Sequence, residues 1–227
     1  MAEIGEEAAI FDVWQAASLG DLDRLKELSG EDGFDINAVD DRGFTPICWS
    51  ARNGHEQCVT FLVEQEADLE KGSFGGLKPL HHACNKNLER LVKALMAAKA
   101  DVNATDDNMD TPLHYACSRG VLNIVVALTG NGADIAVVNS QGTSPLHKAC
   151  ICGHLAVTKK LVDQGADING ADAQGDTAMH LAAKSGFPAI IKFLIDTGAE
   201  QSTNQNGKTP KDCAVNKAVL ECFPADE

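Results

Sequence analysis

The sequence predicts an all-α solenoid, in which short helix–turn–helix units stack one on the next. Two recurring phrases predict this fold. The first reads Thr-Pro-Leu-His-x-Ala at its fullest, and its second position falls at residues 46, 79, 112, 145, 178 and 210. The second begins Ala-Asp and starts at residues 67, 100, 133 and 166. Steps of 33 residues, with a last step of 32, indicate an array of structural repeats.

The two phrases resemble those of the ankyrin repeat family. The family's signature is intact at Thr111–Ala116 and nearly so at Ser144–Ala149, and its closing Gly-Ala-Asp-x-Asn phrase is complete at Gly165–Asn169. The resemblance covers almost the whole chain and is specific for the fold. It implies an ankyrin repeat solenoid with six helix–turn–helix repeats, a truncated C-terminal cap and short β-turn fingers. In the family, the signature histidine hydrogen-bonds within the turn and ties adjacent repeats together.

The repeat period divides the chain into one ankyrin repeat domain, residues 9–223, between short ends. We expect an acidic, frayed segment at 1–8 and a tail at 224–227. The repeats are expected at about 9–39, 40–72, 73–105, 106–138, 139–171 and 172–203, followed by the cap at 204–223. The first repeat lacks Thr-Pro, as terminal repeats often do. The initial Met and a cap at each end lead us to expect a complete chain.

Local signals justify the helices of each repeat. In the second repeat, Thr45 is a helix N-cap, Pro46 fits the first helical position, and Gly54 forms the junction between the two helices. The first repeat uses Gly20 at the same junction, and leucines at 22, 25 and 28 form the apolar stripe of its second helix. The fifth repeat is regular except for Ile151 and Cys152 before Gly153.

Three repeats depart from the pattern. In the third, Lys78 replaces the capping threonine and Asn87 replaces the junction glycine, which asparagine tolerates. In the fourth, Met109 stands where the turn glycine belongs, so we expect a strained or rearranged turn. In the sixth, Pro188 lies in the first turn of the second helix. The cap keeps Thr209-Pro210 and continues with polar residues.

The charge and hydropathy of the chain exclude several classes of protein. A net charge of −14 disfavours binding to nucleic acid or to an anionic membrane surface. There is no apolar run long enough to span a bilayer, and no basic region precedes an apolar one at the N-terminus. We therefore expect a cytoplasmic protein, with the nucleus as a further location.

The cysteines and histidines fit a structural role better than a chemical one. Cys84, Cys117 and Cys150 are one repeat apart, in a position that holds alanine in other repeats, so we expect reduced thiols that pack in the core. A histidine lies three residues before each of them, which could make half of a zinc site. However, the same histidine recurs as His180 with no cysteine after it. A metal-dependent enzyme that uses His-x-x-Cys pairs is therefore a remote alternative.

No other catalytic pattern is present. The chain lacks a Gly-x-Ser-x-Gly elbow and a phosphate-binding Gly-x-x-x-x-Gly-Lys loop. We expect no enzyme, no catalytic, cofactor-binding or metal-binding residues, and no cofactor. By the resemblance, Asn37, Asn103 and Asn169 are at positions where ankyrin repeats can be hydroxylated.

Candidate partner-binding residues are the repeat positions that the fold leaves free. By the resemblance, partners contact the turn tips and the inner face of the first helices. Large apolar residues gather in repeats two to four. Those in turns favour an interface, because the fold needs no apolar residue there. Trp49 and Tyr115 are explained equally well by packing between helices and by an interface. Basic residues end several first helices beside acidic fingertips that include Asp176, which suggests a charge-complementary partner. The predicted interface comprises Asp41, Arg42, Phe44, Trp49, Arg52, Phe74, Leu77, Lys86, Asp107, Asp110, Tyr115, Arg119, Lys148 and Lys184.

The predicted function is protein–protein interaction through the concave face and turn tips of the array. The expected partner is another protein, and we expect the chain to be a monomer that binds neither nucleic acid nor membrane. One alternative is a gankyrin-like assembly chaperone of the proteasome regulatory particle. It rests on length, repeat number and the tetrapeptide Thr177–His180.

Overall fold

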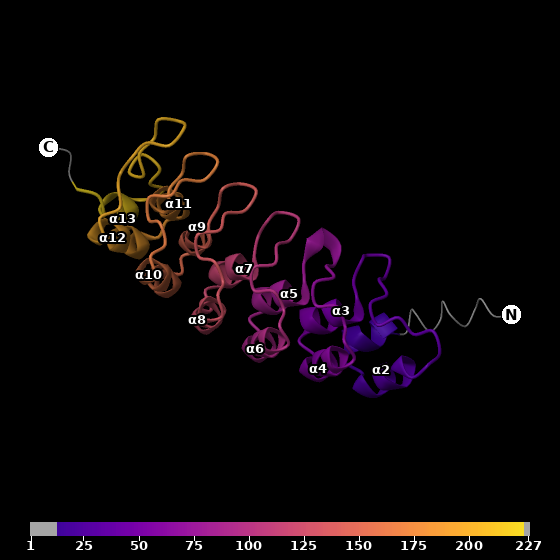
Figure 1. Ribbon diagram of the computed structural model, residues 1–227. Coiled ribbons are helices and arrows are strands. Elements are labelled where there is room, and N and C mark those ends of the chain that lie inside the picture. The colour runs from indigo at the N-terminus through magenta and orange to yellow at the C-terminus, as the bar shows by residue number, and fades with distance from the viewer. Residues whose placement is uncertain (1–12, 225–227) are drawn as a thin grey trace. The chain divides into compact units, whose positions relative to one another are not determined.

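The computed structural model describes residues 13–224 (Figure 1). They form two compact halves, which we call the N-terminal half (residues 13–112) and the C-terminal half (residues 113–224) and describe separately. The segment predicted to fray, residues 1–8, and the last three residues of the predicted tail lie outside the described residues.

Paired helices alternate with loops in both halves. After a helical segment at residues 13–19, the N-terminal half contains α2 (Leu22–Ser29), α3 (Pro46–Asn53), α4 (Glu56–Glu64), the 3-10 turn η1 (Phe74–Gly76), α5 (Pro79–Asn85) and α6 (Glu89–Ala97). The C-terminal half contains α7 (Pro112–Arg119, whose first residue lies at the boundary), α8 (Leu122–Gly130), α9 (Pro145–Ile151), α10 (Leu155–Asp163), α11 (Ala178–Ser185), α12 (Pro188–Asp196) and α13 (Lys217–Leu220). This is the predicted all-α ankyrin solenoid.

Like helices stack on like helices within each half. The first helices α3 and α5 contact each other, as do the second helices α4 and α6, and the same holds for α9 with α11 and α10 with α12. In the N-terminal half, the loops that precede α3 and α5 extend to one side of the helices, and we call these loops fingers (Figure 1). A finger and the exposed side of the first helix that follows it form the inner face of a repeat.

The signature residues make the contacts that hold each repeat to the next. Ser144 caps α9, and the backbone N–H of Ser144 donates to Nδ1 of His147 at 3.0 Å. Nε2 of His147 lies 3.0 Å from the carbonyl oxygen of Gly170, at the end of the same repeat. Nε2 of His180 lies 2.9 Å from the carbonyl oxygen of Lys208, in the following repeat. In the N-terminal half, the same nitrogen of His81 lies 3.1 Å from the carbonyl oxygen of Asp110. The predicted tying role of these histidines is confirmed.

One leucine per repeat anchors the core at a spacing of 33 residues. Leu62 and Leu95 in the N-terminal half, and Leu128, Leu161 and Leu194 in the C-terminal half, are all fully buried. The three cysteines predicted to pack are also buried, and none of them forms a disulfide with another described residue. Burial raises the pKa of the Cys150 thiol to about 12, so it stays protonated and inert at neutral pH.

Departures from the glycine pattern are accommodated by left-handed backbone. Met109 has a φ of 62°, and its N–H donates to the carbonyl oxygen of Asp106 at 3.0 Å. The corresponding bond at Gly142, to Asn139, is 2.9 Å. The Met109 turn is therefore strained, but it keeps the geometry of the regular turn. Asn87 is left-handed as predicted, with a φ of 61°.

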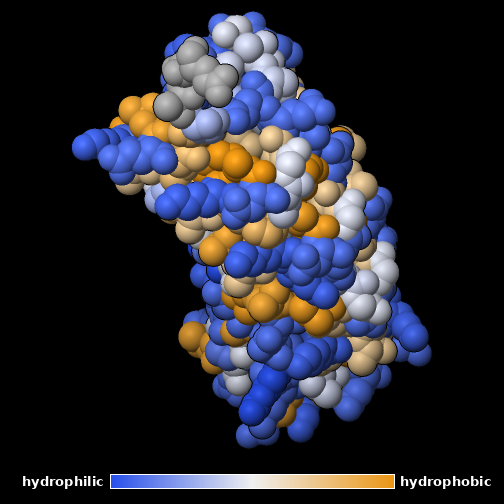
Figure 2. Space-filling model, turned by 90° about the vertical axis from the view of Figure 1, so that its left-hand side faces the viewer, coloured by the Kyte–Doolittle hydropathy of each residue, from blue (hydrophilic) through white to orange (hydrophobic). Residues whose placement is uncertain are grey.

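The surface carries no single dominant apolar area on the face drawn in Figure 2, where hydrophobic and hydrophilic groups alternate. This mixture suits a chain with 33 acidic and 19 basic residues.

Among residues 13–224, no helix has both the length and the hydropathy that crossing a membrane requires.

Candidate protein-interaction surface

Two aromatic rings and an arginine stack on the inner face of the N-terminal half. The rings of Phe44 and Trp49 lie 4.5 Å apart between centroids, with 26° between their planes. The guanidinium carbon of Arg52 lies 5.2 Å from each ring centroid. His82 of the next repeat approaches Phe44 at 5.6 Å between centroids. We call Phe44, Trp49, Arg52 and His82 the aromatic–arginine cluster.

Hydrogen bonds fix this cluster to its finger. The indole N–H of Trp49 donates to Oδ2 of Asp40 at 2.9 Å, while Oδ1 of Asp40 accepts the backbone N–H groups of Arg42 and Phe44. One carboxylate thus ties the finger to α3. Because these groups are already ordered, little side-chain entropy remains to be lost when a partner binds.

His82 is held neutral inside the cluster. Burial, and to a smaller extent the neighbouring charge of Arg52, lower the pKa of His82 to about 3. Its Nε2 lies 2.8 Å from the hydroxyl of Ser73. A neutral imidazole leaves Arg52 as the cation of the cluster.

The two turn phenylalanines differ in exposure, and only Phe74 is as exposed as predicted. Phe74 is 79% exposed at the tip of its finger, as an interface residue should be. Phe44, which we expected to be free, is only 5% exposed, because it lies between Trp49 and His82. The prediction of a free Phe44 was therefore wrong, and it forms the base of the cluster. Leu77 is half-buried.

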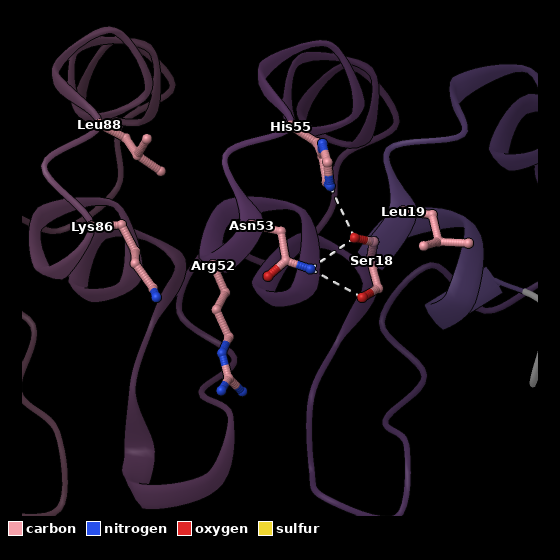
Figure 3. A pocket seen from close by; sticks show the side chains of 7 residues that line it. All are labelled: Ser18, Leu19, Arg52, Asn53, His55, Lys86 and Leu88. Atoms are coloured by element: carbon pink, nitrogen blue, oxygen red, sulfur yellow. Dashed lines mark hydrogen bonds between the residues drawn. The ribbon is translucent and has the colours of Figure 1, made fainter.

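A pocket of about 540 Å³ opens beside the cluster. It is lined by Ser18, Leu19, Arg52, Asn53, His55, Lys86 and Leu88 (Figure 3). The amide of Asn53 donates to the carbonyl oxygen of Ser18 at 2.7 Å and to its hydroxyl at 3.0 Å. Nε2 of His55 lies 2.9 Å from the same carbonyl oxygen. We call this cavity the basic pocket, because the side chains of Arg52 and Lys86 extend in the same direction along it (Figure 3).

The predicted acidic fingertips divide into two groups. Asp41 and Asp107 are exposed, as is Arg42, whereas Asp110 is 8% and Asp176 is 3% exposed. The prediction of Asp110 and Asp176 as exposed tips was wrong. Both precede the N-cap of a first helix, at the repeat position that also holds Phe44, and the neighbouring repeat covers this position.

The predicted row of basic residues is not uniform. Arg52 and Lys184 occupy one repeat position, and Lys86 and Arg119 occupy the next one. Lys184 forms an ion pair with Asp176, which also accepts a hydrogen bond from Asn204 at 2.7 Å. Burial raises the pKa of Asp176, but these two hydrogen bonds outweigh it and leave that pKa below its ordinary value. Lys184 is thus engaged within the fold.

The remaining predicted residues belong to the C-terminal half. Tyr115 and Lys148 are half-buried on α7 and α9, and Arg119 is exposed at the end of α7. The sequence analysis missed the part played by Leu19, His55 and Leu88 in the basic pocket. The signal available for Leu19 was an apolar residue at a helix end, just before a junction glycine.

The hydrogen bonds of the signature histidine disfavour a metal site at the His-x-x-Cys pairs. His81 accepts the N–H of Lys78 at Nδ1 and contacts a carbonyl oxygen with Nε2, so both ring nitrogens are engaged. Among residues 13–224, no group of three or more His, Cys, Asp or Glu side chains is placed to hold a metal ion. The His-x-x-Cys pairs therefore act as parts of the repeat.

Comparison with known families agrees with this architecture. A profile described as "Ankyrin repeats (3 copies)" matches residues 13–106 and 80–172, and "Ankyrin repeats (many copies)" matches residues 153–195. The chain belongs to the ankyrin repeat family. The ankyrin repeat domain of human ASB11 has a similar structure, with a TM-score of 0.83, 27% identity, and coverage of 95% of this chain and 99% of that one. The ankyrin repeat domain of Bcl-3 shares the fold, with a TM-score of 0.79, 24% identity, and coverage of 93% and 96%.

Curated relatives of this ankyrin protein match over short segments. The human DNA-binding protein RFXANK is 41% identical over 25% of this chain and 22% of its own length. Mouse ankyrin repeat and SAM domain-containing protein 6 is 36% identical over 29% and 8%. The Schizosaccharomyces pombe palmitoyltransferase akr1 is 41% identical over 24% and 8%. The chain thus spans less than a quarter of each relative, and the likeness concerns the repeats.

Proposed function

We propose that this ankyrin protein binds another protein through the inner face of its N-terminal half and performs no chemistry of its own. Ankyrin repeat proteins mediate protein–protein interactions. The observation that carries the proposal is the aromatic–arginine cluster, next to a phenylalanine that is 79% exposed at a fingertip. Large aromatic and arginine side chains dominate the binding energy of protein interfaces.

The cluster is suited to binding because it is rigid before a partner arrives. Arg52 is held over two rings, and Trp49 is held by Asp40. Fixing such side chains in advance reduces the entropy lost on association. Phe74 adds an apolar anchor whose burial by a partner would be favourable, at roughly 25 cal/mol per Å² of apolar surface removed from water.

The non-enzymatic, cytoplasmic and nuclear assignments are part of this proposal, as is the monomeric state. Ankyrin repeats are typically interaction scaffolds, although one relative, akr1, is a palmitoyltransferase. The engaged nitrogens of His81 disfavour a metal-dependent enzyme.

The proteasome-chaperone alternative gains no support from the contacts of its tetrapeptide. Nδ1 of His180 lies 2.9 Å from the hydroxyl of Thr177, in the same cap that Ser144 and His147 form at α9. The tetrapeptide therefore serves the repeat and does not distinguish one ankyrin protein from another.

Affinity capture from an extract of the native cell tests the proposal. The wild-type chain is compared with a Phe74→Ser/Arg52→Ser variant. Serine is chosen because Ser140 and Ser118 occupy the same repeat positions as Phe74 and Arg52. The control is Gln174→Ser/Lys148→Ser, which changes a fingertip and an inner helix of the C-terminal half. We expect one protein to be retained by the wild type and the control and lost by the first variant. Equal retention by all three would contradict the proposed surface.

A further inference from the structure

We infer that the basic pocket receives an acidic segment of the partner protein that also carries a large apolar side chain. The inference rests on the proposed function and deepens it, since it gives the chemistry of the partner. The pocket combines two cations, Arg52 and Lys86, with two leucines, Leu19 and Leu88 (Figure 3).

The two cations are distinctive because the chain is strongly acidic. Its net charge is −14, and several of its basic side chains pair with acids, as in Lys93 with Glu89 and Lys184 with Asp176. Among residues 13–224, neither Arg52 nor Lys86 forms an ion pair with a carboxylate. Two unpaired cations that share one pocket favour a ligand of opposite charge.

The geometry of Arg52 leaves it able to bind a carboxylate. Its guanidinium lies over the faces of Phe44 and Trp49, and ring faces do not use the in-plane N–H donors of the group. Those donors match the two oxygens of a carboxylate. Lys86 is exposed on the next repeat and extends in the same direction, so it offers a second contact for an acidic chain (Figure 3).

The leucines explain why the segment should also be apolar. Leu19 is 69% exposed at the edge of the pocket, and Leu88 is half-buried at the start of α6. The polar groups between them are already satisfied, because Asn53 and His55 both hydrogen-bond to Ser18. The groups that a partner can still satisfy are therefore two cations and two apolar side chains.

A library of short random peptides, displayed on phage, tests the inference with defined material. Peptides are selected on the wild-type chain, on Arg52→Glu/Lys86→Glu, and on Lys99→Glu/Lys192→Glu as a control. Both variants change the net charge equally, but Lys99 and Lys192 are exposed residues that do not line the pocket. We expect the wild type and the control to enrich peptides with Asp or Glu beside Leu, Ile, Phe or Met, and the pocket variant to lose them.

The affinity of the most enriched peptide, measured by fluorescence anisotropy, gives the size of the effect. We expect about tenfold or greater weakening with the pocket variant, and stronger weakening by salt for the wild type than for the variant. Circular dichroism checks that the variants are folded. The milder Arg52→Gln/Lys86→Gln variant, which removes the two charges without reversing them, checks that the weakening does not reflect misfolding. Peptides without acidic enrichment, equal binding by the pocket variant, or tighter binding of oligothymidylate would overturn the inference.

The two proposals fail in different ways. If capture identifies a partner that depends on Phe74 and Arg52, but the selected peptides show no acidic bias, the proposed function stands and the acidic segment falls. If Phe74→Ser/Arg52→Ser retains every captured protein while acidic peptides still require Arg52 and Lys86, the pocket binds as inferred, but the proposed protein-binding surface falls.

Discussion

The two halves of the chain differ in how they fill the left-handed positions of the repeat. In the N-terminal half, Glu66, Asn87, Lys99 and Met109 have φ between 61° and 70°. In the described C-terminal half, every residue with positive φ is glycine. Lys99 corresponds to Gly132, which is 33 residues later, as Met109 corresponds to Gly142. A side chain at such a position is strained, since only glycine adopts this conformation freely.

The half with the irregular turns also carries the aromatic–arginine cluster and the basic pocket. In the C-terminal half the turns are regular, and Lys184 is paired within the fold. The comparison teaches that the non-glycine residues at left-handed positions and the surface with unsatisfied chemistry lie in the same half. We therefore expect the N-terminal half to have less favourable turns and to carry the binding surface.

Removal of a core leucine should have the largest effect and should be similar in both halves. Leu95 and Leu161 occupy the same repeat position, and both are fully buried. Replacement of either by alanine should cost about 2–5 kcal/mol, because it removes apolar contacts and leaves a cavity. Urea unfolding measures the loss. Clearly unequal costs would mean that the halves differ in core packing and not only in their turns.

Acid should destabilise the N-terminal half next most strongly. Burial lowers the pKa of His81 to about 4 and of His82 to about 3, from an ordinary value near 6.5. The unfolded chain therefore takes up protons below about pH 6.5 while the folded chain does not. The stability due to these histidines is complete above pH 6.5 and is lost as the pH falls towards 3. Each should account for roughly 2 kcal/mol between pH 7 and pH 5.

Urea unfolding at the two pH values checks this, with His82→Tyr as the matched variant. Tyrosine occupies the same repeat position in the fourth repeat, as Tyr115. The loss of stability between pH 7 and pH 5 should be smaller in this variant by the contribution of one histidine. An unchanged pH dependence would show that His82 titrates normally in the folded chain.

Exchange of the turn residues should have the smallest effect and bears most directly on the comparison. Lys99→Gly should stabilise the chain and Gly132→Lys should destabilise it, each by about 1 kcal/mol. A Cβ atom added at Gly132 would meet no atom within 4 Å, so the substitution tests mainly the backbone conformation. Thermal unfolding of both variants measures the difference. Effects of the same sign in the two variants would contradict the role assigned to these turns.

The sequence predicted the fold well because the repeat period fixes which positions cap and pack. The caps at Thr45 and Ser144 and the tying role of His81 followed directly from the repeated phrase. The exposure of finger residues did not follow, because it depends on the neighbouring repeat. The residue before the N-cap is buried whether it is apolar, polar or acidic, as in Phe44, Thr143, Asp110 and Asp176. Residue type alone therefore did not reveal the burial of this position.

The basic pocket was predicted only in part for a related reason. Arg52 and Lys86 were visible as charges at helix ends, but they belong to different repeats and to different positions of the pattern. Their meeting with Leu19 and Leu88 depends on how neighbouring repeats stack. The left-handed Glu66 and Lys99 were missed although a signal was available, because each directly precedes an Ala-Asp phrase at the position that holds Gly132 and Gly165 in other repeats.

The central claim is that the partner binds the N-terminal half, and site-specific photo-crosslinking tests it most directly. The photoreactive residue p-benzoylphenylalanine is placed at position 74 in one protein and at position 173, the exposed equivalent in the C-terminal half, in another. Both are irradiated in an extract of the native cell. A partner that is crosslinked from position 74 and not from position 173 is the predicted result. Crosslinking from position 173 alone would contradict the account.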